Sequence, residues 1–251
     1  MSTAMNLTCF KAYDVRGIYP DQLDADLARA VGTAFVRVAG ISRAAGGAGA
    51  VVVGHDMRPS GPELVAAFAD GVMSQGVDVI EIGLASTDAL YFASGSLGFP
   101  GAMFTASHNP AEYNGIKLCK SAARPIGQDS GLRRIRDLVI EGVPMPNRSP
   151  GKISEKDMLV EYVDFLIGMF GDELTSAQRR LKVVIDAGNG MAGHTAPAVM
   201  EKLNVDVVPM YFELDGTFPN HEANPIDAAN VKDLQAAVKK HKADIGLAFD
   251  G

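Results

Sequence analysis

Residues 51–82, VVVGHDMRPSGPELVAAFADGVMSQGVDVIEI, predict a strand, a helix and a second strand in succession. Val51–Val53 is a continuous apolar run, which is typical of a buried strand. Ser60 and Glu63 have the spacing of a capping box and predict the start of a helix, whose apolar positions follow at Leu64, Phe68 and Val72. Residues 77–82 predict the second strand. A helical crossover between two strands implies parallel pairing, so this stretch indicates an α/β fold.

The same alternation extends over the rest of the chain and divides it into two domains. Residues 143–151, VPMPNRSPG, have the composition of a linker, and we place the domains at residues 1–146 and 147–251. Before the linker we also expect helices over 23–38 and 132–139 and a strand over 102–104. After it we expect a helix capped by Ser154, followed in order by strand 181–185, helix 192–203, strand 205–211, helix 228–242 and strand 244–249.

The bulk composition is that of a folded protein with a hydrophobic core. Of the 251 residues, 47% are hydrophobic, and the formal net charge is -7. This negative charge argues against a protein whose partner is a nucleic acid. Cys9 and Cys119 have no metal-type or disulfide-scaffold spacing, and no apolar run approaches the ~18 residues of a membrane span. We therefore expect a cytoplasmic protein with no nucleic-acid and no membrane partner.

The segment Thr105–Pro110, TASHNP, points to the chemistry of the chain. It follows an expected strand and precedes residues 112–115, EYNG, which predict a turn. Ser107 and His108 should therefore lie in an exposed loop at the carboxyl end of a strand, where ligands gather in parallel sheets. Lys117 follows two residues after the turn. A serine, an imidazole and a lysine on one loop suit phosphate chemistry, because a phosphoryl group brings ~1.5 to 2 negative charges that nearby cations balance.

A serine hydrolase is the first competing interpretation of this segment. It would need His108 to take the proton of Ser107, but adjacent residues of an extended segment point to opposite sides. The chain also has no G-x-S-x-G motif around any serine. Phosphate chemistry is therefore the better interpretation.

A dinucleotide site is the second competing interpretation. Gly188–Gly193 matches G-x-G-x-x-G after a predicted strand, with Glu213 about twenty residues beyond. However, Asp186 would repel a pyrophosphate, and Pro209 interrupts the next strand, although an edge strand tolerates proline. We favour a tight glycine turn that packs a strand on a helix.

Several motifs together resemble the α-D-phosphohexomutase family, specifically its phosphomannomutase/phosphoglucomutase branch. The resemblance spans essentially the whole chain and rests on five segments in order: Phe10–Gly17, Gly54–Arg58, Thr105–Lys117, Val184–Gly190 and Asp215–His221. The nearest sister, phosphoglucosamine mutase, usually opens with a Phe-Gly-Thr-Asp-Gly type sequence and has an aspartate where Tyr113 stands. The resemblance implies two consecutive three-layer α/β domains with mixed, mostly parallel sheets.

The activity that this resemblance implies is the interconversion of hexose 1-phosphate and hexose 6-phosphate. Phosphorylated Ser107 would give its phosphate to a sugar monophosphate, and the resulting sugar bisphosphate would return the other phosphate. By the same resemblance, Lys117 serves as general base and His108 positions the reacting groups as a donor. Arg16 and Tyr13 would line the site, and Arg16 suits phosphate oxygens. Arg58 could be either a site residue or a loop anchor.

The resemblance also implies a metal ion and an activator. Mg2+ would be held by phosphorylated Ser107 and by Asp250, the first aspartate of a D-G-D-x-D-R loop. A glucose 1,6-bisphosphate-type activator would maintain the phosphoserine. Because the sequence stops at Gly251, it resembles an N-terminal half, and we expect weak Mg2+ binding and negligible mutase activity from these 251 residues alone.

Three alternatives stay open at this point. The chain could be a phosphoglucosamine mutase, a short noncatalytic homologue that binds or regulates, or a nucleotide-binding dehydrogenase built on Gly188–Gly193. The residues present do not discriminate glucose phosphates from mannose phosphates, and they do not define the oligomeric state.

Overall fold

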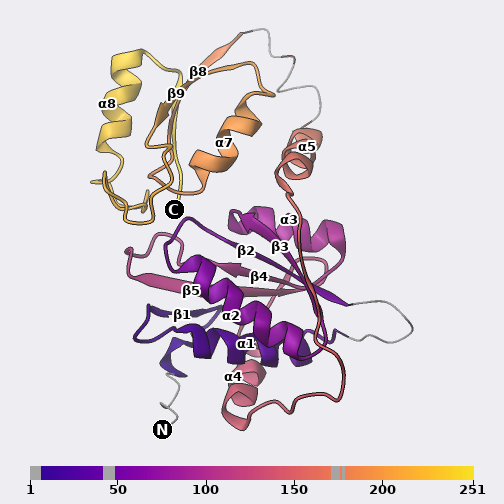
Figure 1. Ribbon diagram of the computed structural model, residues 1–251. Coiled ribbons are helices and arrows are strands. Elements are labelled where there is room, and N and C mark those ends of the chain that lie inside the picture. Colours follow the sequence, from indigo (N-terminus) through magenta and orange to yellow (C-terminus); the bar gives the residue numbers. More distant parts are fainter. Residues whose placement is uncertain (1–6, 42–48, 171–175, 177–178) are drawn as a thin grey trace. The chain divides into compact units, whose positions relative to one another are not determined.

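The computed structural model describes residues 7–41, 49–170, 176 and 179–251, and the chain divides into two compact units. The first unit comprises Met1–Ala106 with Glu112–Asp157, and the second comprises Ser107–Ala111 with Met158–Gly251. Each unit has its own sheet (Figure 1). Within the described ranges, no helix is long and apolar enough to cross a membrane.

The first unit contains a mixed sheet with helices packed on it. Its strands are β1 (Val15–Ile18), β2 (Ala50–His55), β3 (Asp78–Leu84), β4 (Gly101–Phe104), β5 (Tyr113–Lys120), β6 (Arg124–Pro125) and β7 (Ile153–Glu155). Its helices are α1 (Ala25–Val38), α2 (Gly61–Ser74), α3 (Thr87–Leu97) and α4 (Leu132–Glu141), with short 3-10 helices at Leu7–Cys9 and Gln128–Ser130. The predicted strand, helix and strand over residues 51–82 are therefore confirmed as β2, α2 and β3.

The strand order in this sheet is β1-β5-β4-β2-β3-β7, with β6 paired to β5. β2 pairs in parallel with β3 and β4, and β3 pairs in parallel with β7. β5 runs antiparallel to β1, β4 and β6. The prediction of a mixed sheet is confirmed, and its parallel part is the one that residues 51–82 indicated.

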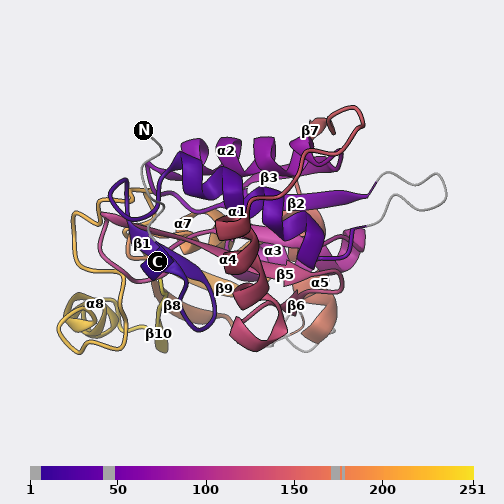
Figure 2. The ribbon, with the colours of Figure 1, turned by 90° about the horizontal axis from the view of Figure 1, so that it is seen from below.

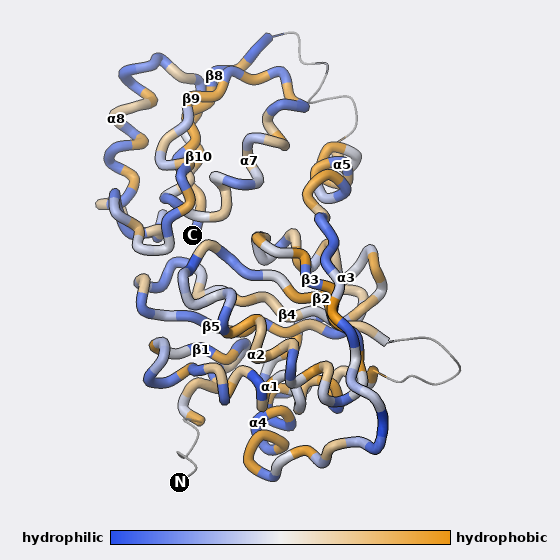
Figure 3. The backbone as a smooth tube through the Cα atoms, in the orientation of Figure 1, coloured by the Kyte–Doolittle hydropathy of each residue, from blue (hydrophilic) through white to orange (hydrophobic). Residues whose placement is uncertain are grey.

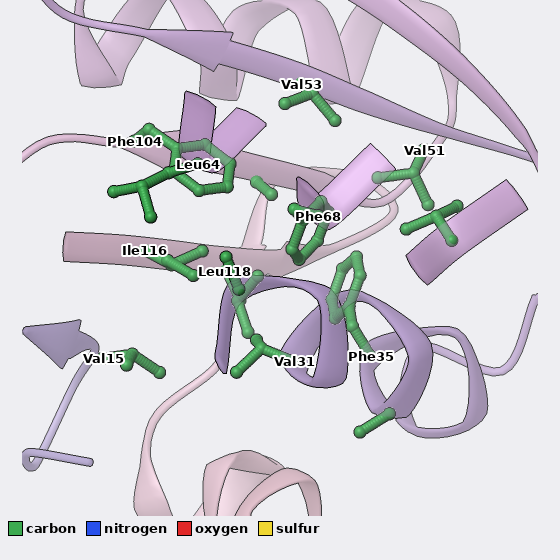
Figure 4. Close-up of a cluster of buried hydrophobic side chains, with 14 of the residues drawn as sticks. Val15, Val31, Phe35, Val51, Val53, Leu64, Phe68, Phe104, Ile116 and Leu118 are labelled. Carbon is green, nitrogen blue, oxygen red and sulfur yellow. The ribbon is translucent and has the colours of Figure 1, made fainter. Parts of the chain in front are cut away.

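Helices cover both faces of this sheet and enclose the main core. α1, α2 and α4 lie on one face and α3 on the other, with α1 and α2 side by side (Figures 1 and 2). Phe68 of α2 packs between Phe35 of α1 and Phe104 of β4, with ring centroids 5.9 and 5.5 Å apart (Figure 4). All three rings are fully buried. β2 is hydrophobic along most of its length (Figure 3) and largely buried, as its continuous valine run predicts.

Two local predictions are wrong: the capping box at Ser60 and the turn over residues 112–115. In both cases, polar side chains form hydrogen bonds with residues far away in sequence. Ser60 has helical rather than extended dihedral angles, and its hydroxyl accepts a hydrogen bond from Asn114 Nδ2 at 2.8 Å instead of forming a capping box. Glu63 accepts a hydrogen bond from the Tyr19 hydroxyl. Residues 113–115 are not a turn either, since the turn ends at Glu112, β5 begins at Tyr113, and Asn114 is fully buried within β5.

The segment after the predicted linker is a strand rather than the start of a helix. Ser154 lies in β7, which pairs with β3 and covers an edge that β3 would otherwise leave open. The first unit consequently continues to Asp157, past the boundary that we predicted between residues 146 and 147. The expected helix is present as α5 (Leu159–Phe170), with Tyr162 and Val163 buried.

The second unit is built on a parallel sheet. Its strands β8 (Leu181–Asp186), β9 (Val205–Met210) and β10 (Ile245–Ala248) lie in the order β10-β8-β9, and its other helices are α7 (Ala192–Met200) and α8 (Lys232–His241). Pro209 is tolerated because β9 is an edge strand. α7 and α8 are shorter than predicted, and Asp227 instead holds a turn before α8 by accepting a hydrogen bond from Ala229 N at 2.8 Å. The predicted fold class, two α/β domains with mixed, mostly parallel sheets, is confirmed.

Both cysteines are expected to be unreactive in the folded chain. Cys9 and Cys119 are free and fully buried, and burial raises the pKa of both thiols. Since the thiolate is the reactive form, a raised pKa lowers its population at neutral pH. We expect no rapid reaction with Ellman's reagent in native buffer and reaction of both thiols in guanidinium chloride. Rapid labelling of either thiol in native buffer would contradict the burial.

Candidate active site

One buried carboxylate in the first unit holds two cations. Arg16 lies in β1 and Lys117 in β5, and the antiparallel register of these strands places Arg16 opposite Gly115. The Asp14 Oδ2 atom accepts hydrogen bonds from Arg16 Nη2 at 2.6 Å and from Lys117 Nζ at 3.3 Å. The side chain of Asp14 is only 8% exposed. The carboxylate therefore fixes the direction of both cations, and charge-assisted hydrogen bonds of this kind are the stronger ones.

The other predicted residue of this region is exposed. Tyr13 directly precedes Asp14, and its side chain is 80% exposed. Arg16 also donates a hydrogen bond from Nη1 to the Ala106 carbonyl at 3.3 Å, at the residue before Ser107 in the chain. Sequence reasoning did not single out Asp14, although it lies inside the segment Phe10–Gly17.

In the second unit, Ser107 and His108 bind the same carboxylate. The Ser107 hydroxyl donates to Asp250 Oδ1 at 2.6 Å, and His108 Nδ1 lies 2.9 Å from Asp250 Oδ2. Asp250 follows β10, as the sequence predicted. Ser107 has a φ of 54°, in the left-handed region that residues other than glycine rarely adopt. Our assumption of an extended segment, with the two side chains on opposite sides, is therefore wrong.

A second buried carboxylate, Asp186, ends β8 and supports the glycine turn. It is 1% exposed and accepts hydrogen bonds from Gly188 N at 3.0 Å and from His221 Nε2 at 3.0 Å. The other ring nitrogen of His221 lies 2.8 Å from the Glu222 carbonyl.

The glycines of this turn serve close packing. A Cβ atom at Gly193 would lie 2.1 Å from the Phe212 carbonyl oxygen, so only glycine allows α7 to begin this close to the chain that follows β9. Gly188 has a φ of +54°, which glycine adopts without strain. Both observations agree with the interpretation of Gly188–Gly193 as a packed turn.

The two halves of the chain match the two parts of one family pattern. Residues 8–142 match phosphoglucomutase/phosphomannomutase, alpha/beta/alpha domain I, and residues 160–251 match alpha/beta/alpha domain II. The chain belongs to the phosphoglucomutase/phosphomannomutase family. The resemblance inferred from the five segments is thus confirmed, and Gly188–Gly193 falls within domain II of this family.

Relatives in the phosphoglucomutase/phosphomannomutase family are similar along the whole chain. The Escherichia coli protein named phosphomannomutase is 40% identical over 253 positions, which cover 98% of this chain and 54% of that protein. A protein of Pseudomonas aeruginosa strain PAO1 named phosphomannomutase/phosphoglucomutase is 39% identical over 256 positions, covering 100% and 52%. The chain thus spans about half the length of the curated relatives that it matches.

A solved structure of a family member is also similar to this chain along nearly its whole length. The crystal structure of a phosphoglucomutase/phosphomannomutase family protein from Burkholderia thailandensis has a TM-score of 0.86 to this chain at 36% identity. The match covers 98% of this chain and 53% of that one. Both units therefore have counterparts in a solved family member.

The oxygen atoms of Ser107 and Asp250 are of the chemical type that binds hard cations. A serine oxygen and a carboxylate oxygen lie 2.6 Å apart, and Mg2+ prefers oxygen ligands of this type. Across the described ranges, no group of three or more histidine, cysteine, aspartate or glutamate side chains is placed to hold a metal ion. Ser107 and Asp250 therefore supply two oxygen atoms of the kind that Mg2+ prefers.

Proposed function

We propose that the chain carries out the phosphoryl-transfer part of a phosphohexomutase reaction, with Ser107 as the phosphate carrier. The observation that carries the proposal is the Ser107 hydroxyl, which is held on a left-handed turn 2.6 Å from the Asp250 carboxylate. The substrates are hexose phosphates, glucose or mannose 1- and 6-phosphate. The names of the relatives support this substrate class over glucosamine phosphates.

The transfer step exchanges one phosphorus–oxygen bond for another. The bond from phosphorus to Ser107 Oγ breaks while a sugar hydroxyl oxygen forms a new bond to the same phosphorus, and the hydroxyl proton goes to the amine of Lys117, which acts as general base in its neutral form. The reverse step returns the other phosphate of the sugar bisphosphate to Ser107. Such transition states are loose, so positioning and charge neutralisation supply most of the catalysis.

The remaining residues would orient and neutralise the reacting groups. The contact of His108 Nδ1 with Asp250 at 2.9 Å supports the role of His108, which would position the reacting groups as a donor. Arg16 would bind phosphate oxygens, and Tyr13 would contact the sugar. Asp14 would act by orienting Arg16 and Lys117, because it accepts hydrogen bonds from both side chains. Asp14 is thus a positioning residue that sequence reasoning missed.

Two small molecules complete the proposal. Ser107, once phosphorylated, and Asp250 would hold Mg2+, which supplies charge stabilisation at the phosphoryl oxygens when bound. Glucose 1,6-bisphosphate would charge Ser107 at the start and restore the phosphoserine when it is lost. The cytoplasmic location stays a prediction from sequence.

Phosphorylation of the chain tests this function directly. After incubation with glucose 1,6-bisphosphate and Mg2+, we expect intact-mass measurement to show one added phosphoryl group and peptide mapping to place it on Ser107. Fructose 1,6-bisphosphate, a bisphosphate of different ring geometry, is the matched control reagent. A chain that stays unmodified, or that is modified only at other residues, would refute the proposed function.

Removal of the metal is expected to slow this phosphorylation. With EDTA in place of Mg2+, the rate of phosphoryl addition to Ser107 should fall at least about tenfold, because the carboxylate of Asp250 then faces the incoming phosphoryl group without a cation. Quenched time points analysed by mass spectrometry measure the rate. An EDTA-treated chain that reacts as fast as the Mg2+ sample would show that Asp250 has no metal-binding role.

A further inference from the structure

Asp56 and Arg58 form a buried ion pair directly after β2. Arg58 Nε donates to Asp56 Oδ2 at 3.3 Å, and Arg58 N donates to Asp56 Oδ1 at 3.0 Å. The side chains are 0% and 1% exposed for Arg58 and Asp56 respectively. Burial raises the pKa of Asp56 and lowers that of Arg58, while each charge opposes the shift of the other. Such a pair adds little net stability, since desolvation of both charges offsets their attraction.

What the pair does hold is the chain on either side of Ser107 and His108. Just before these residues, the Thr105 side chain forms a hydrogen bond to the Asp56 carboxylate. Just after them, the Tyr113 carbonyl accepts a hydrogen bond from Arg58 Nη1 at 2.8 Å. The pair therefore contacts both the entry and the exit of the segment 106–112.

Backbone hydrogen bonds reinforce the same two points. Asp56 N donates to the Phe104 carbonyl at 2.9 Å, and Thr105 N donates to the Gly115 carbonyl at 3.0 Å. With these bonds, the ends of β2 and β4 and the start of β5 meet at one buried cluster. All of these residues belong to the first unit.

We propose that Asp56 and Arg58 are positioning residues that fix both ends of the segment 106–112, which carries Ser107 and His108. Neither side chain touches substrate, because both are buried. Arg58 is thus a loop anchor, which resolves the two roles that its sequence motif left open. The inference rests on the proposed function, since it assigns the pair to phosphoryl transfer at Ser107.

The informative variant removes both charges together, because removing one would leave the other buried and uncompensated. We expect Asp56→Asn with Arg58→Met to keep the thermal midpoint of the parent chain. Amide hydrogen exchange in residues 106–112 should become about tenfold faster, which corresponds to the loss of one hydrogen bond from a charged donor. The maximal rate of Ser107 phosphorylation by glucose 1,6-bisphosphate should fall about tenfold, with an unchanged half-saturating concentration.

A matched control removes an exposed ion pair from the same unit. Arg29 and Asp70 lie 2.8 Å apart with about half of each side chain exposed. The variant Arg29→Met with Asp70→Asn should leave the exchange of residues 106–112 and the phosphorylation rate unchanged. If this control changes both readings as much as the buried variant does, the effect is not specific to Asp56 and Arg58, and the inference fails.

Two further outcomes would overturn the inference. One is a double variant whose amide hydrogen exchange in residues 106–112 is as slow as in the parent chain. The other is a double variant in which exchange becomes faster to the same extent in every strand of the first unit. If the double variant does not fold, Arg58→Lys keeps the charge and is judged by the same two readings. Failure of the parent chain to take phosphate on Ser107 would instead refute the proposed function, while hydrogen exchange would still decide whether the pair holds the segment.

Discussion

Replacing Ser107 with alanine is expected to abolish phosphorylation of the chain by glucose 1,6-bisphosphate. The variant lacks the oxygen atom that accepts the phosphoryl group, and it also loses the hydrogen bond from that hydroxyl to Asp250 Oδ1. We expect phosphoryl addition at least about a thousandfold slower than in the parent chain, as for the loss of a nucleophile from a site whose other groups remain. Peptide mapping by mass spectrometry at matched times measures the difference.

The control for this variant is a serine remote from the Ser107 segment in sequence. Ser96 is exposed and lies in α3, and Ser96→Ala should be phosphorylated at the parent rate. Circular dichroism of both variants should match the parent, because Ser107 lies in a loop outside the cores of the two sheets. Uptake of one phosphoryl group by Ser107→Ala would show that another residue is the acceptor.

Replacing Gly71 with alanine is expected to cause a large loss of stability, because the added methyl group would clash with the backbone of a neighbouring helix. Gly71 lies in α2 where it crosses α1, and a Cβ atom there would be 2.1 Å from the Arg29 carbonyl oxygen. Gly32 of α1 makes the reciprocal close approach to the Phe68 carbonyl. Neither backbone can move away without separating α1 from α2, and both helices contribute side chains to the core, among them Phe35 and Phe68 (Figure 4). We expect a loss of about 3 kcal/mol, the upper end for overpacked cores.

Gly95 provides the matched control for this substitution. It also lies within a helix, α3, but a Cβ atom there would meet no atom within 4 Å. Gly95→Ala should therefore stabilise the chain by about 0.5 to 1 kcal/mol, because alanine loses less backbone entropy on folding. Urea denaturation of the three proteins gives the comparison. If Gly71→Ala unfolds at the urea concentration of the parent, α1 and α2 are not packed as closely as described.

The parallel part of the first sheet could be predicted from sequence because its signals are strong. β2 is a continuous valine run, and α2 has three large apolar residues at helical spacing. The start of β5 could not be predicted, because Asn114-Gly115 is a common turn signal. In the folded chain, Asn114 satisfies its side chain by donating to Ser60 and by accepting from Gly115 N at 2.7 Å. The Ser60 partner comes from tertiary structure, and together with the pairing of β5 with β1 and β4 it outweighs the local preference for a turn.

The candidate site was predictable in its residues but not in its geometry. Ser107, His108 and Asp250 each stand in a recognisable motif, yet their meeting at one carboxylate depends on the left-handed backbone at Ser107. Sequence gives no signal for that conformation at a serine. Asp14 was missed for another reason. Its role depends on a hydrogen bond with Lys117, 103 residues away, and the pairing of β1 with β5 brings these two residues together.

Transfer of phosphate from Ser107 to a hexose monophosphate is the measurement that tests the central claim most directly. The chain is first labelled on Ser107 with isotopically marked glucose 1,6-bisphosphate, freed of excess reagent and mixed with glucose 6-phosphate and Mg2+. We predict that the label leaves Ser107 and appears in an equal amount of glucose 1,6-bisphosphate. Label that stays on Ser107, or that leaves only as inorganic phosphate, would contradict a role for Ser107 as the phosphate carrier.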